Sequence, residues 1–343
     1  MSARKPLPRV LFLLTVAILF AAGAIMAWFQ SWKAGRLVDL ASGSQVIDLP
    51  SGKIEYALHG EGVPVLVFHS APGGYDQGVA LAGFLTGEGF EIVSPSRPGY
   101  LQTPLTSGPS PTDQAEAFSW LLEDLEVDRV AVLGVGHGGP AAIEFARKFS
   151  PRISALVLVS ALTARPPQGG ATPFPLAVLR AIGGDFRSFC FAEMSSRFPN
   201  RSLAASAPFL APATPGGEST WISSLLQSAT QLDEFRHLVD SITPSSPREK
   251  GTANDILQAD SLQPLDLKAI NPPTLLVHGA LDKFIPLASA QAAANTIPNA
   301  ELHIVANGGH LPIIGPGADA ARQRIVSFLQ HHTAAPPPSE AGE

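Results

Sequence analysis

The chain has 343 residues, of which 45% are hydrophobic and 15% charged, and its formal net charge is -6. Because no basic excess is present, the composition argues against a nucleic-acid-binding protein, and we expect no nucleic-acid partner. The single cysteine, Cys190, excludes an intrachain disulfide. The fold must therefore be stabilised by packing, and we expect Cys190 to be a small buried hydrophobic residue.

The first predicted element is an apolar helix near the N-terminus. Residues 10–29 contain no charged side chain, which is about the length that spans the hydrocarbon core of a bilayer, and three basic residues precede them. We expect a transmembrane anchor at 10–29, with Trp28 and Trp32 at the membrane interface, a cytoplasmic tail at 1–9 and the main domain outside the cytoplasm. A cleavable signal peptide is the alternative, because residues 22–24 read AGA.

Apolar runs separated by longer segments follow this helix. Two of them flank a turn of the sequence PSG, which predicts an antiparallel hairpin at the edge of a sheet. The later runs are mostly separated by segments long enough for helices, a pattern typical of parallel strands covered by helices on both faces. The predicted strands are Gln45–Leu49, Lys53–Leu58, Val65–Phe68, Glu91–Val93, Val130–Leu133, Ala155–Val159, Thr274–Val277 and Leu302–Val305.

Two helices can be predicted from local signals. Ser110 is followed by Pro111 and by Asp113, a capping pattern that starts a helix, and apolar residues then recur on one face. The stretch VAVLGVGHGGPAA, residues 130–142, combines an apolar strand with a cluster of glycines, and a segment that can be helical continues over 140–149. It therefore predicts a strand, a sharp turn and a helix.

One domain with a large insertion is expected over residues 44–332. The segment at about 162–263 lies between two predicted strands and is rich in proline, glycine and apolar residues, so we expect a helical cap insertion there. The C-terminal segment 333–343 is proline-rich and lacks periodicity, which is typical of a disordered tail. We expect the large apolar residues of the insertion to form the core of the cap more often than to contact a ligand. They are Phe174, Leu179, Phe189, Phe191, Phe198, Phe209 and Trp221.

Five motifs follow one another in an order that is typical of a single family. They are FHSAPGGYDQG, SRPGY, VLGVGHGGPAA, VHGALDKFIP and NGGHLP. With these motifs the sequence resembles the α/β-hydrolase family over nearly all of residues 44–332. The resemblance implies an α/β fold with a mostly parallel sheet flanked by helices, a helical cap insertion, and an active site at the carboxyl ends of the strands.

The resemblance also implies positions for three catalytic groups, in the order nucleophile, acid and histidine. These positions hold Gly136, Asp282 and His310, so glycine replaces the nucleophile serine. The oxyanion hole of the family uses backbone N–H groups, which here would be those of Ala71 and His137. Two further motifs depart from the family pattern. Serine replaces the glycine that usually follows the histidine of the first motif, and serine replaces the aspartate that usually precedes RPGY.

Because glycine carries no nucleophile, an acyl-enzyme mechanism through residue 136 is excluded. The first remaining hypothesis, which we favour, is a non-catalytic pseudoenzyme that binds a ligand or partner. In the second, Asp282 and His310 act as general base on water or on an acidic C–H of the substrate, as in a hydrolase or lyase. The third relocates the nucleophile to Ser70, although a hydroxyl that satisfies loop backbone is its plainer interpretation. We expect a small apolar or amphipathic ligand, no cofactor and no metal.

Overall fold

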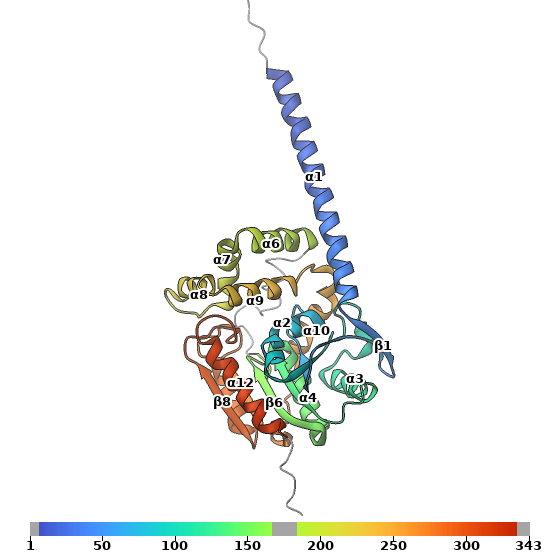
Figure 1. Cartoon of the computed structure of the whole chain (residues 1–343), viewed down its shortest axis with the longest axis vertical. Helices are drawn as coiled ribbons and strands as arrows, with labels where there is room; N and C mark the ends of the chain where they lie inside the picture. The colour runs from blue at the N-terminus through green and yellow to red at the C-terminus, as the bar shows by residue number, and fades with distance from the viewer. Residues whose placement is uncertain (1–6, 167–183, 335–343) are drawn as a thin grey trace, which may run out of the picture.

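The computed structural model describes residues 7–166 and 184–334 and contains an eight-stranded, mostly parallel sheet (Figure 1). Its strand order is β1-β2-β4-β3-β5-β6-β7-β8, and β1 and β2 form an antiparallel hairpin at one edge. The strands are β1 (Gln45–Leu49), β2 (Gly52–Gly60), β3 (Val63–Phe68), β4 (Phe90–Pro95), β5 (Val130–Val135), β6 (Ile153–Val159), β7 (Thr274–Gly279) and β8 (Ala300–Val305). The eight predicted strands and the edge hairpin are confirmed.

Helices cover both faces of this sheet, because side chains alternate between the faces along each strand. On β3, for example, Val65 packs on one helical layer and Leu66 on the other. The first layer contains α2 (Tyr75–Ala82) and α12 (Ala318–Thr333), and the second contains α3 (Pro111–Asp124), α4 (Gly139–Lys148) and α11 (Leu287–Thr296). Short 3-10 helices are η1 (Gly83–Glu88), η2 (Leu105–Ser107), η3 (Gly136–Gly138), η4 (Ser150–Arg152), η5 (Ser246–Arg248) and η6 (Leu267–Ala269).

The start of α3 shows how local sequence sets an element. The Ser110 hydroxyl accepts a hydrogen bond from the Asp113 N–H at 3.2 Å, and the Asp113 carboxylate accepts one from the Ser110 N–H at 3.1 Å. This capping box satisfies backbone donors that the first turn of a helix leaves unpaired. Phe118 and Leu121 are then fully buried on the face toward the sheet, so the predicted helix is confirmed.

A layer of helices inserted between β6 and β7 lies over one end of the sheet (Figure 1). The layer contains α6 (Asp185–Arg197), α7 (Pro199–Leu210), α8 (Gly217–Leu226) and α9 (Ala229–Asp240), and the insertion ends with α10 (Glu249–Ser261), which lies beside α2 in the view of Figure 1. We call these inserted helices the cap. Phe174 and Leu179 of the predicted cap, and residues 335–343 of the predicted tail, lie outside the described residues.

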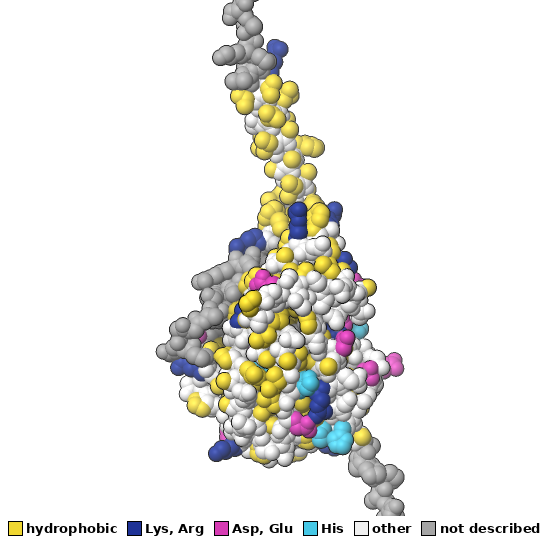
Figure 2. Space-filling view, turned by 90° about the vertical axis from the view of Figure 1, so that its left-hand side faces the viewer, with side chains coloured by type: hydrophobic (Ala, Val, Ile, Leu, Met, Phe, Trp, Pro, Cys, Tyr) yellow, Lys and Arg dark blue, Asp and Glu magenta, His cyan; other side chains and the backbone are white. Residues whose placement is uncertain are grey.

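One long apolar helix, α1 (Leu7–Ser42), projects from the body. By length and composition it could cross a membrane, and its 36 residues correspond to about 54 Å. Figure 2 shows hydrophobic side chains along its projecting part and Lys and Arg side chains where it meets the body. The helix continues well past residue 29, and its last turns pack on the domain.

Aromatic side chains join α1 to the cap helix α6. The rings of Trp28 and Trp32 both lie against Phe189, with centroid distances of 5.0 and 5.4 Å. The ammonium group of Lys33 lies 2.6 Å from the carboxylate of Asp185, at the start of α6. The two tryptophans expected at a membrane interface therefore also form the contact between α1 and the cap.

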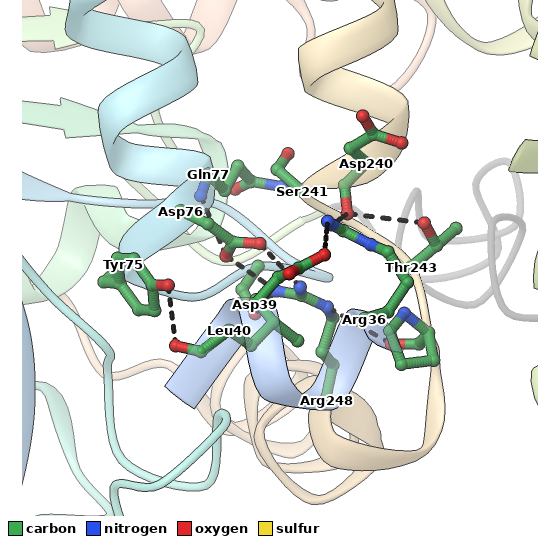
Figure 3. A network of polar contacts seen from close by, with 12 residues as sticks. Arg36, Asp39, Leu40, Tyr75, Asp76, Gln77, Asp240, Ser241, Thr243 and Arg248 are labelled. Carbon is green, nitrogen blue, oxygen red and sulfur yellow. Dashed lines mark hydrogen bonds and ion pairs between the residues drawn. The ribbon is translucent and has the colours of Figure 1, made fainter. Parts of the chain in front are cut away.

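Polar contacts near the end of α1 join it to α9 and α2 (Figure 3). The Arg36 guanidinium donates a hydrogen bond to the carbonyl oxygen of Asp240 at 3.2 Å. The Tyr75 hydroxyl, at the start of α2, donates to the carbonyl oxygen of Leu40 at 2.8 Å. Because α1 is held at two places, by the cap and by α2, its direction relative to the domain is set by packing.

Candidate active site

The turn after β5 has the backbone of a nucleophile elbow, although its central residue is glycine. Strand β5, the 3-10 turn Gly136–Gly138 and α4 follow one another without a linker. Gly136 has a φ of 51°, in the left-handed region where a side chain is strained. A Cβ on Gly138 would overlap the carbonyl oxygen of Phe68, so this turn packs directly against the end of β3.

Asp282 follows β7 and His310 follows β8, and the structure brings these two residues together. His310 Nδ1 lies 2.9 Å from Asp282 Oδ2 and 3.1 Å from Oδ1. Asp282 Oδ1 also accepts hydrogen bonds from the N–H groups of Phe284 and Ile285, at 2.8 and 3.1 Å. These bonds fix the carboxylate toward the ring, so Nδ1 carries the proton of the neutral imidazole and Nε2 points away from Asp282.

The surroundings of Asp282 favour its ionised form. Burial alone would raise the pKa of Asp282, but the His310 ring and the two backbone N–H groups outweigh it, and the pKa lies below its ordinary value. A second ring, that of His278, has its Nε2 3.5 Å from Asp282 Oδ2. Burial lowers the pKa of His278, and its Nε2–H donates to the carbonyl oxygen of Ile285 at 2.9 Å. His278 therefore stays neutral, and the charge of Asp282 acts on His310.

Ser70 lies beside Gly136 at the carboxyl ends of the adjacent strands β3 and β5. The Ser70 hydroxyl accepts a hydrogen bond of 3.4 Å from the N–H of His137. A Cβ on Gly136 would overlap Ser70 Oγ and would lie 3.1 Å from Ser70 Cβ. The Ser70 side chain thus occupies the space beside Gly136 that a side chain at the elbow would need. Ala71, the other residue with an expected oxyanion donor, is buried next to it.

The loop that carries Ser70 is held by the ring of His69. Its Nε2 accepts a hydrogen bond from the Arg97 N–H at 2.9 Å, and its Nδ1–H donates to the carbonyl oxygen of Ser70 at 2.7 Å. Burial holds the pKa of His69 well below its ordinary value, which keeps the ring neutral for these two roles. The Arg97 side chain forms a buried, bidentate ion pair with Asp255 of α10. Ser70 is therefore connected to the cap through buried polar contacts.

A cavity of about 400 Å³ lies between the cap and the carboxyl ends of the strands. On the sheet side its wall includes Ser70, Gly136 and His310, and the cap contributes mainly apolar side chains. The cap residues in the wall include Phe191, Met194, Phe209, Leu210, Phe235 and Leu238. Such a lining favours apolar parts of a ligand over strongly charged ones.

The aromatic residues predicted for the cap core have different roles. Trp221 is buried in the cap, as predicted. Phe191 and Phe209 pack against the same apolar cluster and also line the cavity, and Phe189 is buried against α1. The prediction is wrong for Phe198, which is 55% exposed. Apolar composition alone did not separate these roles, because each depends on which neighbour a helix face meets.

These loops and this sheet order can now be compared with known proteins. The family model described as alpha/beta hydrolase fold matches residues 63–315. This chain belongs to the α/β-hydrolase family. Among solved structures, an α/β-hydrolase-fold protein from Nakamurella multipartita is similar with a TM-score of 0.78 and 29% identity, over 84% of this chain and 99% of that chain.

Two curated relatives of this α/β-hydrolase match it over nearly their whole length. The uncharacterized hydrolase YcgS of Bacillus subtilis is 26% identical, over 83% of this chain and 98% of that protein. The 2-hydroxy-6-oxononadienedioate/2-hydroxy-6-oxononatrienedioate hydrolase 2 of Pseudomonas putida is 27% identical, over 85% of this chain and 98% of that protein. Both relatives are named as hydrolases.

Sequence patterns alone did not place two residues of the cavity wall, Ser160 and Cys190, in the site. Ser160 directly follows β6, has a φ of 40° and lines the cavity, and its buried Oγ has no hydrogen-bond partner among the described residues. Its place at the carboxyl end of a predicted strand was the signal available. Cys190 is exposed and lines the cavity, so the prediction of a buried hydrophobic residue is wrong. α6 turns this face toward the cavity, whereas Phe189 faces α1.

Proposed function

We propose that this protein is a membrane-anchored hydrolase for a small apolar or amphipathic ester, with Asp282 and His310 as its general base. The observation that carries the proposal is the 2.9 Å contact between His310 Nδ1 and Asp282 Oδ2 beside an apolar cavity. Every base-catalysed route requires this pair, whichever group attacks the substrate. The buried, ionised Asp282 stabilises the imidazolium that forms when His310 accepts a proton.

The reaction needs no side chain at residue 136. His310 Nε2 removes a proton from the attacking oxygen, which forms a bond to the carbonyl carbon of the ester. The bond between that carbon and the leaving oxygen then breaks, and His310 returns the proton to the leaving oxygen, so that an alcohol is released. When the attacking oxygen is that of water, the acid is released in the same step. We assign the backbone N–H groups of Ala71 and His137 as donors to the oxyanion of the tetrahedral intermediate.

The cavity wall supports a neutral or singly charged substrate. The relative from Pseudomonas putida is named for a dicarboxylate. Arg187 is the one Lys or Arg among the described residues of this mainly apolar wall, so at least one of two carboxylates would lose hydration without an ion-pair partner, which is costly. We therefore propose an ester with one apolar chain, and not a dicarboxylate, as the substrate of this protein.

The anchor is part of the proposal. α1 is long and apolar enough to cross a membrane, and basic residues precede its apolar part. We propose that it anchors the protein with the main domain outside the cytoplasm. Because α6 contacts α1 with one face and the cavity with another, the cavity would lie close to the membrane surface.

A non-catalytic ligand binder is the second candidate, and the observation that favours it is Gly136. Removing the nucleophile of a serine hydrolase costs on the order of a millionfold in turnover. If no other group attacks the substrate efficiently, the cavity would bind a ligand of the same class without converting it.

Turnover and binding can be measured separately. Full-length protein in detergent micelles is assayed with p-nitrophenyl esters of increasing acyl length, as wild type, as His310→Ala and with exposed His59→Ala as control. We expect turnover to fall by about 10² to 10⁴ in His310→Ala alone. Because Cys190 is the only cysteine and lines the cavity, its rate of alkylation reports occupancy by a non-hydrolysable analogue. Protection of Cys190 without turnover in wild type would favour the second candidate.

A further inference from the structure

We propose that Ser70 is the nucleophile of this site, so that the serine and glycine of the usual family pattern have exchanged places between two loops. This inference rests on the proposed hydrolase function and names the group that attacks the substrate. The first motif reads HSAPGG, with serine after the histidine, and the elbow reads GVGHGG, with glycine at its centre. The two departures from the family pattern therefore complement each other.

The space beside Gly136 supports this assignment. Ser70 Oγ lies so near this glycine that a Cβ at residue 136 would overlap it. A serine at the elbow and the present Ser70 side chain could not both keep their places. The hydroxyl of Ser70 therefore lies beside the turn Gly136–Gly138, where the family carries its nucleophilic oxygen.

The environment of the Ser70 hydroxyl also supports the assignment. Ser70 Oγ accepts a hydrogen bond from the N–H of His137, the backbone group that the family uses to stabilise the oxyanion. Ser70 also lines the same cavity as His310. At 3.4 Å this hydrogen bond is long, so the N–H can exchange it for a shorter, charge-assisted bond to an oxyanion on the neighbouring carbon. A nucleophile must lie next to such a donor, because the oxyanion forms on the atom that it attacks.

The loop that carries Ser70 is held rigidly by buried polar contacts. The Ser70 carbonyl is held by His69 Nδ1–H, and His69 Nε2 is held by the Arg97 N–H, all in buried surroundings. Arg97 is in turn fixed by Asp255 of the cap. Residues that attack a substrate are held in place by such secondary contacts, whereas a hydroxyl that only satisfies loop backbone does not require them.

The reaction then proceeds through a covalent intermediate. Ser70 Oγ bonds to the ester carbonyl carbon while its proton passes to His310 Nε2, and the oxyanion is stabilised by the His137 N–H. The bond to the leaving oxygen breaks, that oxygen takes the proton from His310, and an acyl-Ser70 ester remains. Water, deprotonated by His310, attacks this ester, and the acid is released while Ser70 regains its proton.

Two other roles compete with this one. Ser160 also places a hydroxyl in the cavity wall, and its Oγ is buried without a partner among the described residues. The Ser70 hydroxyl could also act as a plug: by accepting the hydrogen bond of the His137 N–H, it would keep this donor from a substrate oxyanion. Both alternatives give a different outcome in the following experiment.

Full-length protein in detergent micelles is treated with a fluorophosphonate, which bonds covalently to an activated serine, and the modified peptide is identified by mass spectrometry. The variants are Ser70→Ala, His310→Ala and, as a control away from the cavity, Ser154→Ala, which removes another buried hydroxyl. We expect modification at Ser70 in wild type and in Ser154→Ala. In Ser70→Ala and His310→Ala the labelling rate should fall by at least about 10³-fold.

Modification of Ser160, or of any other residue but Ser70, would overturn the proposal, and so would the absence of labelling in folded wild-type protein. A Ser70→Ala variant that hydrolyses esters as fast as wild type, or faster, would also overturn it and would identify the hydroxyl as a plug. In that case loss of ester hydrolysis in His310→Ala would still support the proposed hydrolase. Conversely, labelling at Ser70 without turnover of any ester would support the nucleophile and contradict the ester as substrate class.

Discussion

Exchanging the residues at 70 and 136 would restore the family's usual arrangement, and the structure allows its energetics to be worked out. In Gly136→Ser alone, a side chain at a φ of 51° costs about 1 to 2 kcal/mol of the free energy of unfolding. The new Cβ also displaces the Ser70 hydroxyl, which loses its hydrogen bond from the His137 N–H, about 0.5 to 1.5 kcal/mol. Gly136→Ser should therefore be less stable than wild type by about 1.5 to 3.5 kcal/mol.

The double variant Ser70→Gly with Gly136→Ser should be more stable than the two single variants predict by addition. Ser70→Gly alone loses the same hydrogen bond and makes the unfolded backbone more flexible, and together these effects should lower the free energy of unfolding by about 1 to 2 kcal/mol. Because one bond is lost in both single variants, and because glycine at 70 removes the overlap, the double variant should exceed the additive free energy of unfolding by about 1 kcal/mol.

Thermal unfolding of the full chain in detergent measures this coupling. A difference of about 1 kcal/mol corresponds to a melting temperature about 2 to 4 °C above the additive value. The double variant should also react with a fluorophosphonate at position 136, because the new hydroxyl lies beside His310 and the oxyanion donors. Strict additivity of the three melting temperatures would refute the placement of the Ser70 hydroxyl. A folded double variant that stays inert would show that more than the nucleophile differs from an active hydrolase.

Three further predictions concern stability and location. Burial lowers the pKa of His137 to about 4, whereas the unfolded chain protonates it near 6.5. The free energy of unfolding that the neutral ring contributes should therefore be complete above about pH 6.5 and fall by up to about 3 kcal/mol towards pH 4. In His137→Leu, the melting temperature should change less over this pH range than in wild type. Asp255→Asn should cost about 3 to 5 kcal/mol in thermal unfolding, because it leaves the Arg97 charge buried without its partner, and a loss under about 1 kcal/mol would contradict this. The full chain should stay with membranes after high-salt washing, as judged by fractionation, and release by salt alone would argue against an anchor.

Much of the fold could be predicted because its signals are local. The runs that form β3 and β5 are buried on both faces, so they read as continuous apolar stretches in the sequence. The capping box at Ser110 and Asp113 lies within four residues and starts α3 without help from distant parts of the chain. The order of Gly136, Asp282 and His310 along the chain predicted that they follow β5, β7 and β8, as the structure shows.

Other features could not be predicted because they depend on contacts between distant segments. The Ser70 hydroxyl and Gly136 are 66 positions apart, and nothing in either motif says how close the two residues lie. The division of α6 into one face with Phe189 toward α1 and another with Cys190 toward the cavity is likewise tertiary. Apolar composition fits both faces equally well, so the prediction for Cys190 was wrong.

The strand order explains why either of two loops can supply the attacking hydroxyl. The chain leaves β3 towards β4 on one side and returns to β5 on the other, so β3 and β5 are neighbours although β4 lies between them in sequence. Loops diverge at such a switch point and leave a crevice outside the carboxyl ends of the strands. Ser70 and Gly136 lie side by side at this crevice, and the His137 N–H donates to the hydroxyl of Ser70. A glycine at the elbow therefore removes the usual carrier of the nucleophile, but a hydroxyl from the neighbouring loop lies beside it.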